Sequence, residues 1–230
     1  MLPWLITPAD FPPVEQALDA PAGLLAAGGG LTADWLLAAY RRGVFPWFSP
    51  GQPILWWSPN PRMVLFPEQL HVPHSLMRTV RKEKFEIRLN TAFVEVMRAC
   101  AAPRVGETGT WISEEMIKAY TALHEQGMAH SIEAWLGGNL VGGLYGVALG
   151  KVFFGESMFA RVSDASKVAF VKGVHQLQRL GVVMIDCQMN TPHLARFGAI
   201  EISREDFLCR LETGINQTTP VWRFDKVSVA

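Results

Sequence analysis

Three apolar runs joined by glycine turns constrain the fold of this 230-residue chain more than any other feature. The runs span residues 131–136, 140–149 and 152–159. Gly137-Gly138-Asn139 separates the first two runs and Gly150 separates the last two. Turns this short join neighbouring antiparallel strands. The sequence therefore predicts an antiparallel meander of three strands in the middle of the chain.

Amphipathic stretches on both sides of the meander predict helices. Before it we expect helices at 74–82, 92–101 and 113–126, with a strand at 85–89. After it we expect a long helix at 164–180, a buried strand at 182–188, and short helices at about 191–197 and 203–212. This order is compatible with the GNAT acyltransferase core. The pattern alone predicts an α+β fold.

The first 62 residues have a different composition, rich in Pro, Gly and Trp. A short helix is expected at 34–42, and Gly43 suits the position after its end. Five prolines between residues 46 and 61 exclude a long helix and favour ordered, tight loops. A disordered linker would not carry five aromatic residues between Phe45 and Trp57. We therefore predict a small N-terminal module, residues 1–62, packed on a main domain, residues 63–230.

The composition narrows the range of partners. Lys and Arg number 21, as do Asp and Glu, so the formal net charge is zero. Any contact with nucleic acid must then come from a local basic patch. The N-terminus resembles no signal peptide, and no apolar run reaches about 18 residues, so we expect a cytoplasmic protein without a membrane span. The three cysteines lie far apart in sequence and predict no disulfide framework.

Glu156 stands in an otherwise apolar run from Phe153 to Phe159. A carboxylate in the centre of a sheet is costly unless it is paired or meets a cationic ligand. One interpretation is that Glu156 receives an ammonium or hydroxyl group of a substrate. The other is that it pairs with a nearby cation such as Arg161 or Lys167. The sequence leaves both open.

A second apolar run ends in polar residues at Asp186 and Gln188. Residues two apart on a strand point to the same face, so the Asp could orient the Gln amide or accept a proton from a nucleophile. The alternative is an Asp that caps the following helix, which is the more common arrangement.

Tryptophans in the expected loops offer flat faces for stacking. Base stacking on an aromatic side chain contributes about 1–3 kcal/mol per base. For Trp56 and Trp57 we favour ordinary packing of the small module. Trp47, held between Pro46 and Phe48, fits either role.

Taken together, these segments resemble bacterial leucyl/phenylalanyl-tRNA–protein transferases. The resemblance runs from about residue 23 to about residue 212, and its combined motifs are very specific. They are residues 23–29, RGVFPWF at 42–48, LWWSPNPR at 55–62, TWI at 110–112, HSIE at 130–133, VGGLYG at 141–146, FGESMF at 154–159 with ASK at 165–167, and IDCQ at 185–188. The resemblance implies a small N-terminal module followed by a GNAT-like acyltransferase domain with a central mixed sheet.

The resemblance also implies the reaction. The donor would be an aminoacyl-tRNA carrying Leu or Phe, and sometimes Met. The acceptor would be the α-amine of a protein that begins with Arg or Lys, and the new N-terminal residue would mark that protein for degradation. No metal or organic cofactor is expected, because the ester of the donor is already activated. We expect a monomer.

Site roles follow from the same resemblance. Trp47 and Trp111 would stack on the terminal adenosine of the donor. Glu156 would hold the donor's amino group or the acceptor, while Asp186 and Gln188 would assist deprotonation of the amine and orient it. An apolar pocket, with Gly155 beside it, would take the donor side chain and is expected to be lined by Leu144, Phe153, Met158, Phe170 and Ile185.

Two features leave the details open. Gly173 stands where we expect a bulky apolar residue on the long helix, so the preference between Leu and Phe is undetermined. The contacts with the body of the tRNA are also undefined, and the candidates are Arg41, Arg42, Arg62, Arg78, Arg81, Lys82 and Lys84.

Three other functions are compatible with parts of the sequence. A GNAT acetyltransferase would bind the pyrophosphate of CoA with a glycine-rich turn before a helix, but residues 161–167 contain no glycine and include Asp164. A non-catalytic RNA- or peptide-binding module has little reason to place Glu156 and Asp186 in strands. A peptidyl-bridge aminoacyltransferase of cell-wall synthesis uses a related fold but usually a longer chain.

Overall fold

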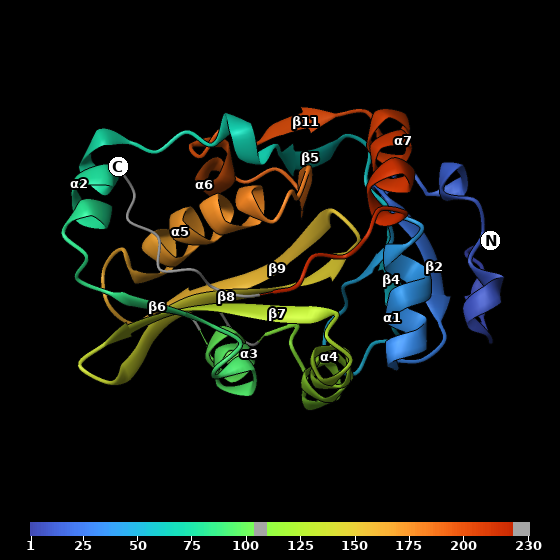
Figure 1. Cartoon of the computed structure of the whole chain (residues 1–230). Helices are drawn as coiled ribbons and strands as arrows, with labels where there is room; N and C mark the ends of the chain where they lie inside the picture. Colours follow the sequence, from blue (N-terminus) through green and yellow to red (C-terminus); the bar gives the residue numbers. More distant parts are fainter. Residues whose placement is uncertain (104–109, 223–230) are drawn as a thin grey trace.

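The computed structural model describes residues 1–103 and 110–222. Its N-terminal part forms a small sheet with the strand order β1-β2-β4-β3. The strands are β1 (Trp4–Leu5), β2 (Leu24–Gly28), β3 (Phe45–Pro46) and β4 (Leu55–Trp57). The helix α1 (Ala33–Tyr40) and the 3-10 turns η1 (Pro8–Asp10) and η2 (Val14–Gln16) complete this part. In Figure 1 it lies at one end of the molecule, next to α7 (Arg204–Ile215).

The main sheet has seven strands in the order β11-β5-β10-β9-β8-β7-β6. β10 and β9 run parallel, and the other neighbours run antiparallel, so the sheet is mixed. The predicted meander forms its centre. The strands are β5 (Arg62–Leu65), β6 (Glu86–Leu89), β7 (Ala129–Leu136), β8 (Asn139–Leu149), β9 (Val152–Ala160), β10 (Met184–Gln188) and β11 (Ile200–Ile202).

Helices cover both faces of the main sheet (Figure 1). The long helix α5 (Ala165–Arg179) lies on one face, and α2 (His74–Arg81) packs beside it after the turn η3 (Pro67–Gln69). The helices α3 (Phe93–Ala101) and α4 (Glu114–Glu125) lie on the other face. The short α6 (Pro192–Ala195) follows β10. Of the helices in residues 1–103 and 110–222, none combines the length and apolar character that crossing a bilayer requires.

Two hydrophobic cores fill the layers. One lies between the sheet and α5 and includes Ile132, Leu144, Phe153, Phe170 and Ile185. The other contains side chains of α3 and α4 together with those of the small N-terminal sheet. The N-terminal part therefore shares its core with the main sheet, and the division after residue 62 stays a prediction. The end of the predicted main domain, residues 223–230, lies outside the described residues.

The sequence-based expectations for the fold are confirmed in most elements. The structure is α+β with a small N-terminal sheet and a larger mixed sheet, and every predicted helix and strand is present. Trp56 is fully buried in the small core, as favoured above, and stacks near Trp35.

One expectation was wrong in part: the segment 45–57 contains the strands β3 and β4 rather than loops alone. Pro46 is tolerated there because β3 is the edge strand of the small sheet, where a missing backbone donor breaks no ladder.

Candidate active site

The site lies where two parallel strands stop pairing. The last paired residues of β9 and β10 are Phe154 and Asp186, so Glu156 and Gln188 each stand two residues beyond the end of the ladder. Both strands are also irregular here. In β9 the register shifts so that Gly155 and Ser157 face consecutive residues of β8, which leaves Glu156 as an extra residue. A bulge of this kind re-aims a side chain, and bulges are frequent beside active sites.

Glu156 is held by tyrosines rather than by a cation. Tyr40 donates a hydrogen bond to Oε1 at 2.6 Å, and Tyr120 lies 3.2 Å from Oε2. Of the two cations considered above, Arg161 donates to the Leu140 carbonyl and Lys167 pairs with Asp164. Burial raises the pKa of Glu156 to about 7, against the opposing hydrogen bond from Tyr40. A carboxyl group with a pKa near neutrality can accept and release protons at working pH.

Asp186 lies behind the site in a buried ion pair. Its carboxylate accepts two hydrogen bonds from Arg62, at 2.9 and 2.7 Å, and the two side chains are 0% and 1% exposed. The Arg62 guanidinium lies between the rings of Phe45 and Phe207. Arg62 is therefore not available to tRNA, which corrects its inclusion among the candidate contacts.

The geometry also corrects how Asp186 meets Gln188. Asp186 Oδ1 accepts a hydrogen bond from the backbone N–H of Gln188 at 2.9 Å, not from its amide group. The reason is a register shift between the two residues, with Gln188 in the left-handed region at φ 58°. The strand periodicity that would place both side chains on one face is lost. Asp186 caps no following helix either, since Thr191 caps α6.

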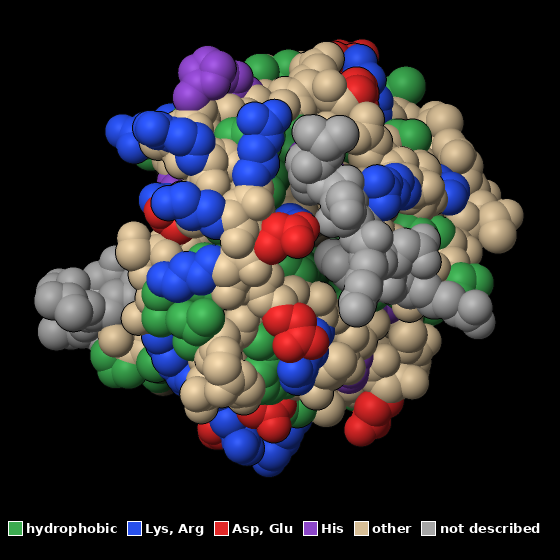
Figure 2. Space-filling model, turned by 60° about the vertical axis from the view of Figure 1, so that its left-hand side comes forward, with side chains coloured by type: hydrophobic (Ala, Val, Ile, Leu, Met, Phe, Trp, Pro, Cys, Tyr) green, Lys and Arg blue, Asp and Glu red, His purple; other side chains and the backbone are tan. Residues whose placement is uncertain are grey.

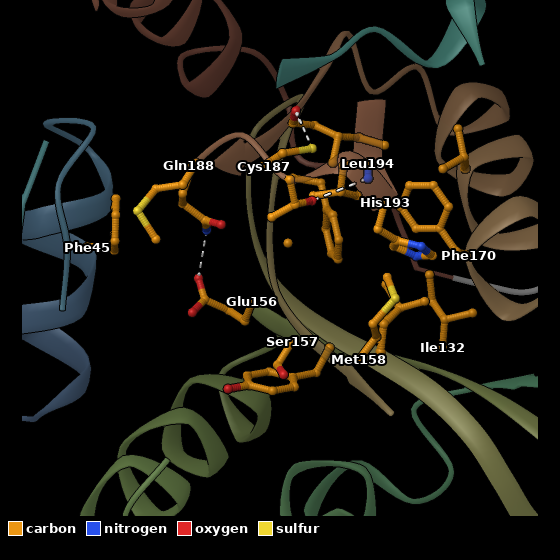
Figure 3. Close-up of a pocket in the computed structure, with 18 of the residues that line it drawn as sticks. Phe45, Ile132, Glu156, Ser157, Met158, Phe170, Cys187, Gln188, His193 and Leu194 are labelled. Atoms are coloured by element: carbon orange, nitrogen blue, oxygen red, sulfur yellow. Dashed lines mark hydrogen bonds between the residues drawn. The ribbon is translucent and has the colours of Figure 1, made fainter. Parts of the chain in front are cut away.

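Gln188 turns its amide toward Glu156. Its Nε2 lies 3.4 Å from Glu156 Oε1, and Figure 3 shows the two side chains facing each other across the cavity. Together they form a polar edge of a mainly apolar pocket, whose lining also includes Ser157, Thr191 and His193. The arrangement offers an acceptor and an amide to a polar group that enters between β9 and β10.

The cavity has a volume of about 610 Å³. It brings together ten of the residues expected to form the site, whereas Asp186 is not among its lining residues. The ten are Trp47, Trp111, Leu144, Phe153, Gly155, Glu156, Met158, Phe170, Ile185 and Gln188. In Figure 3, Phe170 and Met158 project into the same space as Ile132 and His193. This end of the cavity is mainly apolar, and the other end carries Glu156 and Gln188.

Trp47 and Trp111 both line the cavity, and their stacking role stays a prediction. Trp47 is 40% exposed, and its ring lies 5.6 Å from that of Trp57 at a steep angle. Trp57 also donates from Nε1 to the Trp47 carbonyl oxygen at 2.6 Å. Trp57 therefore holds the loop that presents Trp47, while a face of Trp47 remains open to a ligand.

Gly173 affects the apolar end of the cavity indirectly, through its contact with Ile132. A Cβ built on Gly173 would lie 2.5 Å from Ile132 Cδ1, and Ile132 lines the cavity. The lack of a side chain at Gly173 on α5 thus makes room for the Ile132 side chain on β7. Ile132 fills the space where a bulky apolar residue was expected at position 173, and the sequence did not identify it as a cavity residue.

Sequence reasoning also missed the three tyrosines. The chain contains only three, and Tyr40, Tyr120 and Tyr145 are all fully buried around Glu156. Tyr120 and Tyr145 meet edge to face at 5.7 Å. A signal was present, because tyrosine is rarely buried without a partner for its hydroxyl. The three tyrosines are separated by 80 and 25 residues in the sequence, so their meeting around Glu156 could not be predicted from it.

The sequence of the chain is similar to that of known transferases. A protein-family model described as leucyl/phenylalanyl-tRNA protein transferase matches residues 64–212, and one described as the N-terminal domain of that transferase matches residues 29–60. A leucyl/phenylalanyl-tRNA–protein transferase of Nitrosospira multiformis is 58% identical and covers 100% of both chains. One of Aromatoleum aromaticum is 59% identical over 94% of this chain and 92% of its own.

Similarity to solved structures is looser. A functionally unknown conserved protein from Staphylococcus epidermidis aligns with a TM-score of 0.43 at 11% identity, over 78% of this chain and 68% of its own. The L-PGS structure from Bacillus licheniformis aligns with a TM-score of 0.40 at 8% identity, over 68% and 50%. The family assignment therefore depends on the two family models and the sequence relatives.

Proposed function

This chain belongs to the leucyl/phenylalanyl-tRNA protein transferase family and is an enzyme that transfers an aminoacyl group from tRNA to protein; we propose that its donors carry Leu or Phe, and sometimes Met, and that its acceptors are proteins beginning with Arg or Lys. The observation that supports this most is one cavity with an apolar end and a polar edge at Glu156 and Gln188. The product would be marked for degradation.

The apolar end of the cavity is proposed to bind the donor side chain. Its walls come from both sides of the layer between the sheet and α5, with Leu144 and Phe153 on strands and Phe170 on the helix. Charged donors are rejected because their side chains would lose water without gaining a partner. Discrimination among apolar donors is weaker, since one methylene contributes roughly 1–3 kcal/mol.

Gly155 keeps the space above β9 open. The nearest atom to an added Cβ there is the Asp186 carbonyl oxygen at 3.7 Å, which leaves room for a ligand. The terminal adenosine would then reach Trp47 and Trp111 at the rim. Stacking between aromatic faces suits every donor tRNA, because all end in the same base.

Glu156 is proposed as the proton acceptor in the transfer step. The α-amino nitrogen of the acceptor attacks the ester carbon and loses a proton to the Glu156 carboxylate. The bond from that carbon to the ribose oxygen breaks, and the oxygen leaves with a proton. Gln188 orients the amine through its amide, and Asp186 acts indirectly by fixing the Gln188 backbone.

The tRNA body is proposed to contact the exposed basic residues on and after α2, which are Arg78, Arg81, Lys82 and Lys84. Figure 2, which turns this end of the molecule forward, shows Lys and Arg side chains along one side of the face with acidic side chains beside them. A mixed face of this kind predicts modest, salt-sensitive binding. We further propose a cytoplasmic monomer.

A transfer assay tests the proposal. The protein is mixed with radiolabelled Leu-tRNA or Phe-tRNA and with two otherwise identical acceptors, one beginning with Arg and one with Ala. Label on the Arg acceptor alone is the expected result. Absence of label from both, together with acetyl transfer from acetyl-CoA, would overturn it. The turn before α5 makes that outcome unexpected, because Asp164 and Lys167 pair there and no glycine is present.

A further inference from the structure

Four oxygen atoms of three residues from distant parts of the chain meet behind the polar edge of the cavity. They belong to Tyr40 in α1, Tyr120 in α4 and Glu156 in β9. Tyr40 lies 2.6 Å from one carboxyl oxygen, Tyr120 lies 3.2 Å from the other, and the two hydroxyl oxygens are 2.5 Å apart. We call this closed set the carboxyl–tyrosine ring. Each of its three contacts is within hydrogen-bonding distance.

The number of protons in the ring depends on the state of Glu156. When the carboxyl group is ionised, the two hydroxyls supply two hydrogens for three contacts. If both pointed to the carboxylate, the shortest contact, between the tyrosine oxygens, would contain no hydrogen. The favourable arrangement is therefore Tyr120 donating to Tyr40 and Tyr40 donating to Glu156.

Protonation of Glu156 completes the ring. A third hydrogen on Oε2 meets the Tyr120 oxygen, and every contact then has one donor and one acceptor. Tyr40 thus stabilises the ionised state of Glu156 through a charge-assisted hydrogen bond. Tyr120 stabilises the protonated state of Glu156, because its oxygen accepts a hydrogen bond from the carboxyl group.

We infer that Tyr40 and Tyr120 are positioning residues of the transfer reaction: Tyr40 donates a hydrogen bond to the Glu156 carboxylate, and Tyr120 accepts a hydrogen bond from the Glu156 carboxyl group after that group has taken a proton from the acceptor amine. This inference rests on the proposed function. The step moves one proton from the amine nitrogen to Glu156 and then to the departing ribose oxygen or to water. It needs no oxidant, reductant or other reactant.

Burial raises the pKa of Glu156 most, and two charged groups beside the ring also act on it: the Asp186 carboxylate raises this pKa and the Arg62 guanidinium lowers it. Phe154 packs on Tyr40, and Tyr145 of β8 packs edge to face on Tyr120. On the side of β10, Gln188 is neutral, and the charges of Asp186 and Arg62 lie in one ion pair. The inference also gives the N-terminal part a role in the chemistry, because α1 supplies Tyr40.

The test removes one hydroxyl at a time and follows kcat/KM for transfer from pH 5 to 9. Tyr40→Phe removes a donor to the carboxylate, so the midpoint of the profile should rise by about one pH unit. Transfer at pH 6 would fall about tenfold and recover at pH 9. Tyr120→Phe removes the acceptor of the carboxyl proton, so its midpoint should fall.

The matched control is Tyr145→Phe. Among the described residues the Tyr145 hydroxyl has no hydrogen-bond partner, so its loss should leave the midpoint unchanged. A readout independent of activity is the difference in Tm between each variant and the same variant carrying Glu156→Gln, measured over the same pH range. The pH at the midpoint of this difference should rise in Tyr40→Phe and fall in Tyr120→Phe.

The opposing outcomes are distinct. Equal midpoints in wild type, Tyr40→Phe and Tyr120→Phe, with rates lowered alike at every pH, would show that the tyrosines only support the fold and would overturn the inference. A rise in both midpoints would overturn the role of Tyr120. Absence of transfer by the wild-type protein would instead contradict the proposed function.

Discussion

Gln188 Nε2 lies 3.4 Å from Glu156 Oε1, although the two residues stand on neighbouring parallel strands whose pairing ends two residues earlier. Such a contact is long for a hydrogen bond between these groups. A cationic amine entering between the strands would make a shorter and stronger hydrogen bond with Glu156. This supports the proposal that the acceptor amine meets the Glu156 carboxylate at this place.

Replacing Glu156 by Gln should lower the rate of transfer by about 10²–10⁴-fold, the usual contribution of a general base. The amide keeps the size of the side chain but cannot take a proton. Turnover at saturating donor and acceptor is the measurement. Glu201→Gln, which neutralises an exposed carboxylate on β11, is the control and should leave turnover unchanged. Wild-type turnover in Glu156→Gln would remove Glu156 from the mechanism.

The same substitution should stabilise the protein at high pH. Burial raises the pKa of Glu156 from 4.5 to about 7, so the folded state binds more protons than the unfolded state between these values. The wild-type protein therefore loses stability as pH rises through that window. By pH 8 Glu156→Gln should gain on the order of 3 kcal/mol over wild type, with little difference near pH 4.5. Thermal melts at both pH values measure this, and equal Tm differences would contradict it.

Much of the fold could be predicted because local patterns determine it. The meander is encoded by glycine turns, and Ser113 is the N-cap of α4, with its side chain accepting a hydrogen bond from the Met116 N–H. The strands that escaped prediction, such as β5 and β11, are only four and three residues long. Segments this short carry too little periodicity, and the pairing that stabilises them is with distant residues.

The site was predictable in its residue types but not in its geometry. The apolar lining followed from the family motifs, and Glu156 and Gln188 were expected to be polar exceptions. The partners of Glu156 and Asp186 were not, because Tyr40 and Arg62 are each more than 100 residues away. The bulges that re-aim Glu156 and Gln188 depend on interstrand register, which strand periodicity does not reveal.

Breaking the ion pair between Arg62 and Asp186 should destabilise the protein by about 3–5 kcal/mol, because the remaining charge would be buried without a partner. Asp186→Leu and Arg62→Met should each lower the Tm, and the double variant should recover much of the loss. Turnover should stay low in Asp186→Leu and in the double variant, since Gln188 loses the acceptor of its backbone N–H. Melts and transfer rates on all four proteins complete the cycle. Full turnover in the double variant would show that Asp186 contributes stability alone.

Removing the indole of Trp47 should weaken donor binding. Stacking contributes about 1–3 kcal/mol per base, so Trp47→Ala should raise KM for aminoacyl-tRNA at least fivefold with a smaller change in kcat. Trp47→Phe keeps an aromatic face and should retain most of the affinity. Trp57→Phe removes the hydrogen bond to the Trp47 carbonyl oxygen but keeps an aromatic ring beside Trp47, and so tests the support of the loop apart from stacking on the donor. An unchanged KM in Trp47→Ala would exclude the stacking role.

Gly173 should control the balance between Leu and Phe donors. In Gly173→Ala the new Cβ would lie 2.5 Å from Ile132 Cδ1, so the Ile132 side chain must move. Ile132 lines the cavity, and we expect its side chain to move into that space. The narrowed pocket should reject the larger donor more strongly, lowering the ratio of kcat/KM for Phe-tRNA to that for Leu-tRNA by about tenfold.

Shortening Ile132 tests the cause of that change. In Gly173→Ala with Ile132→Val, the missing Cδ1 removes the clash, and the donor ratio should return toward the wild-type value. Ile132→Val alone should shift the ratio toward Phe, because it enlarges the pocket. If Gly173→Ala alters both donors equally and the second substitution restores nothing, the helix glycine does not act through Ile132, and donor preference is set elsewhere in the cavity wall.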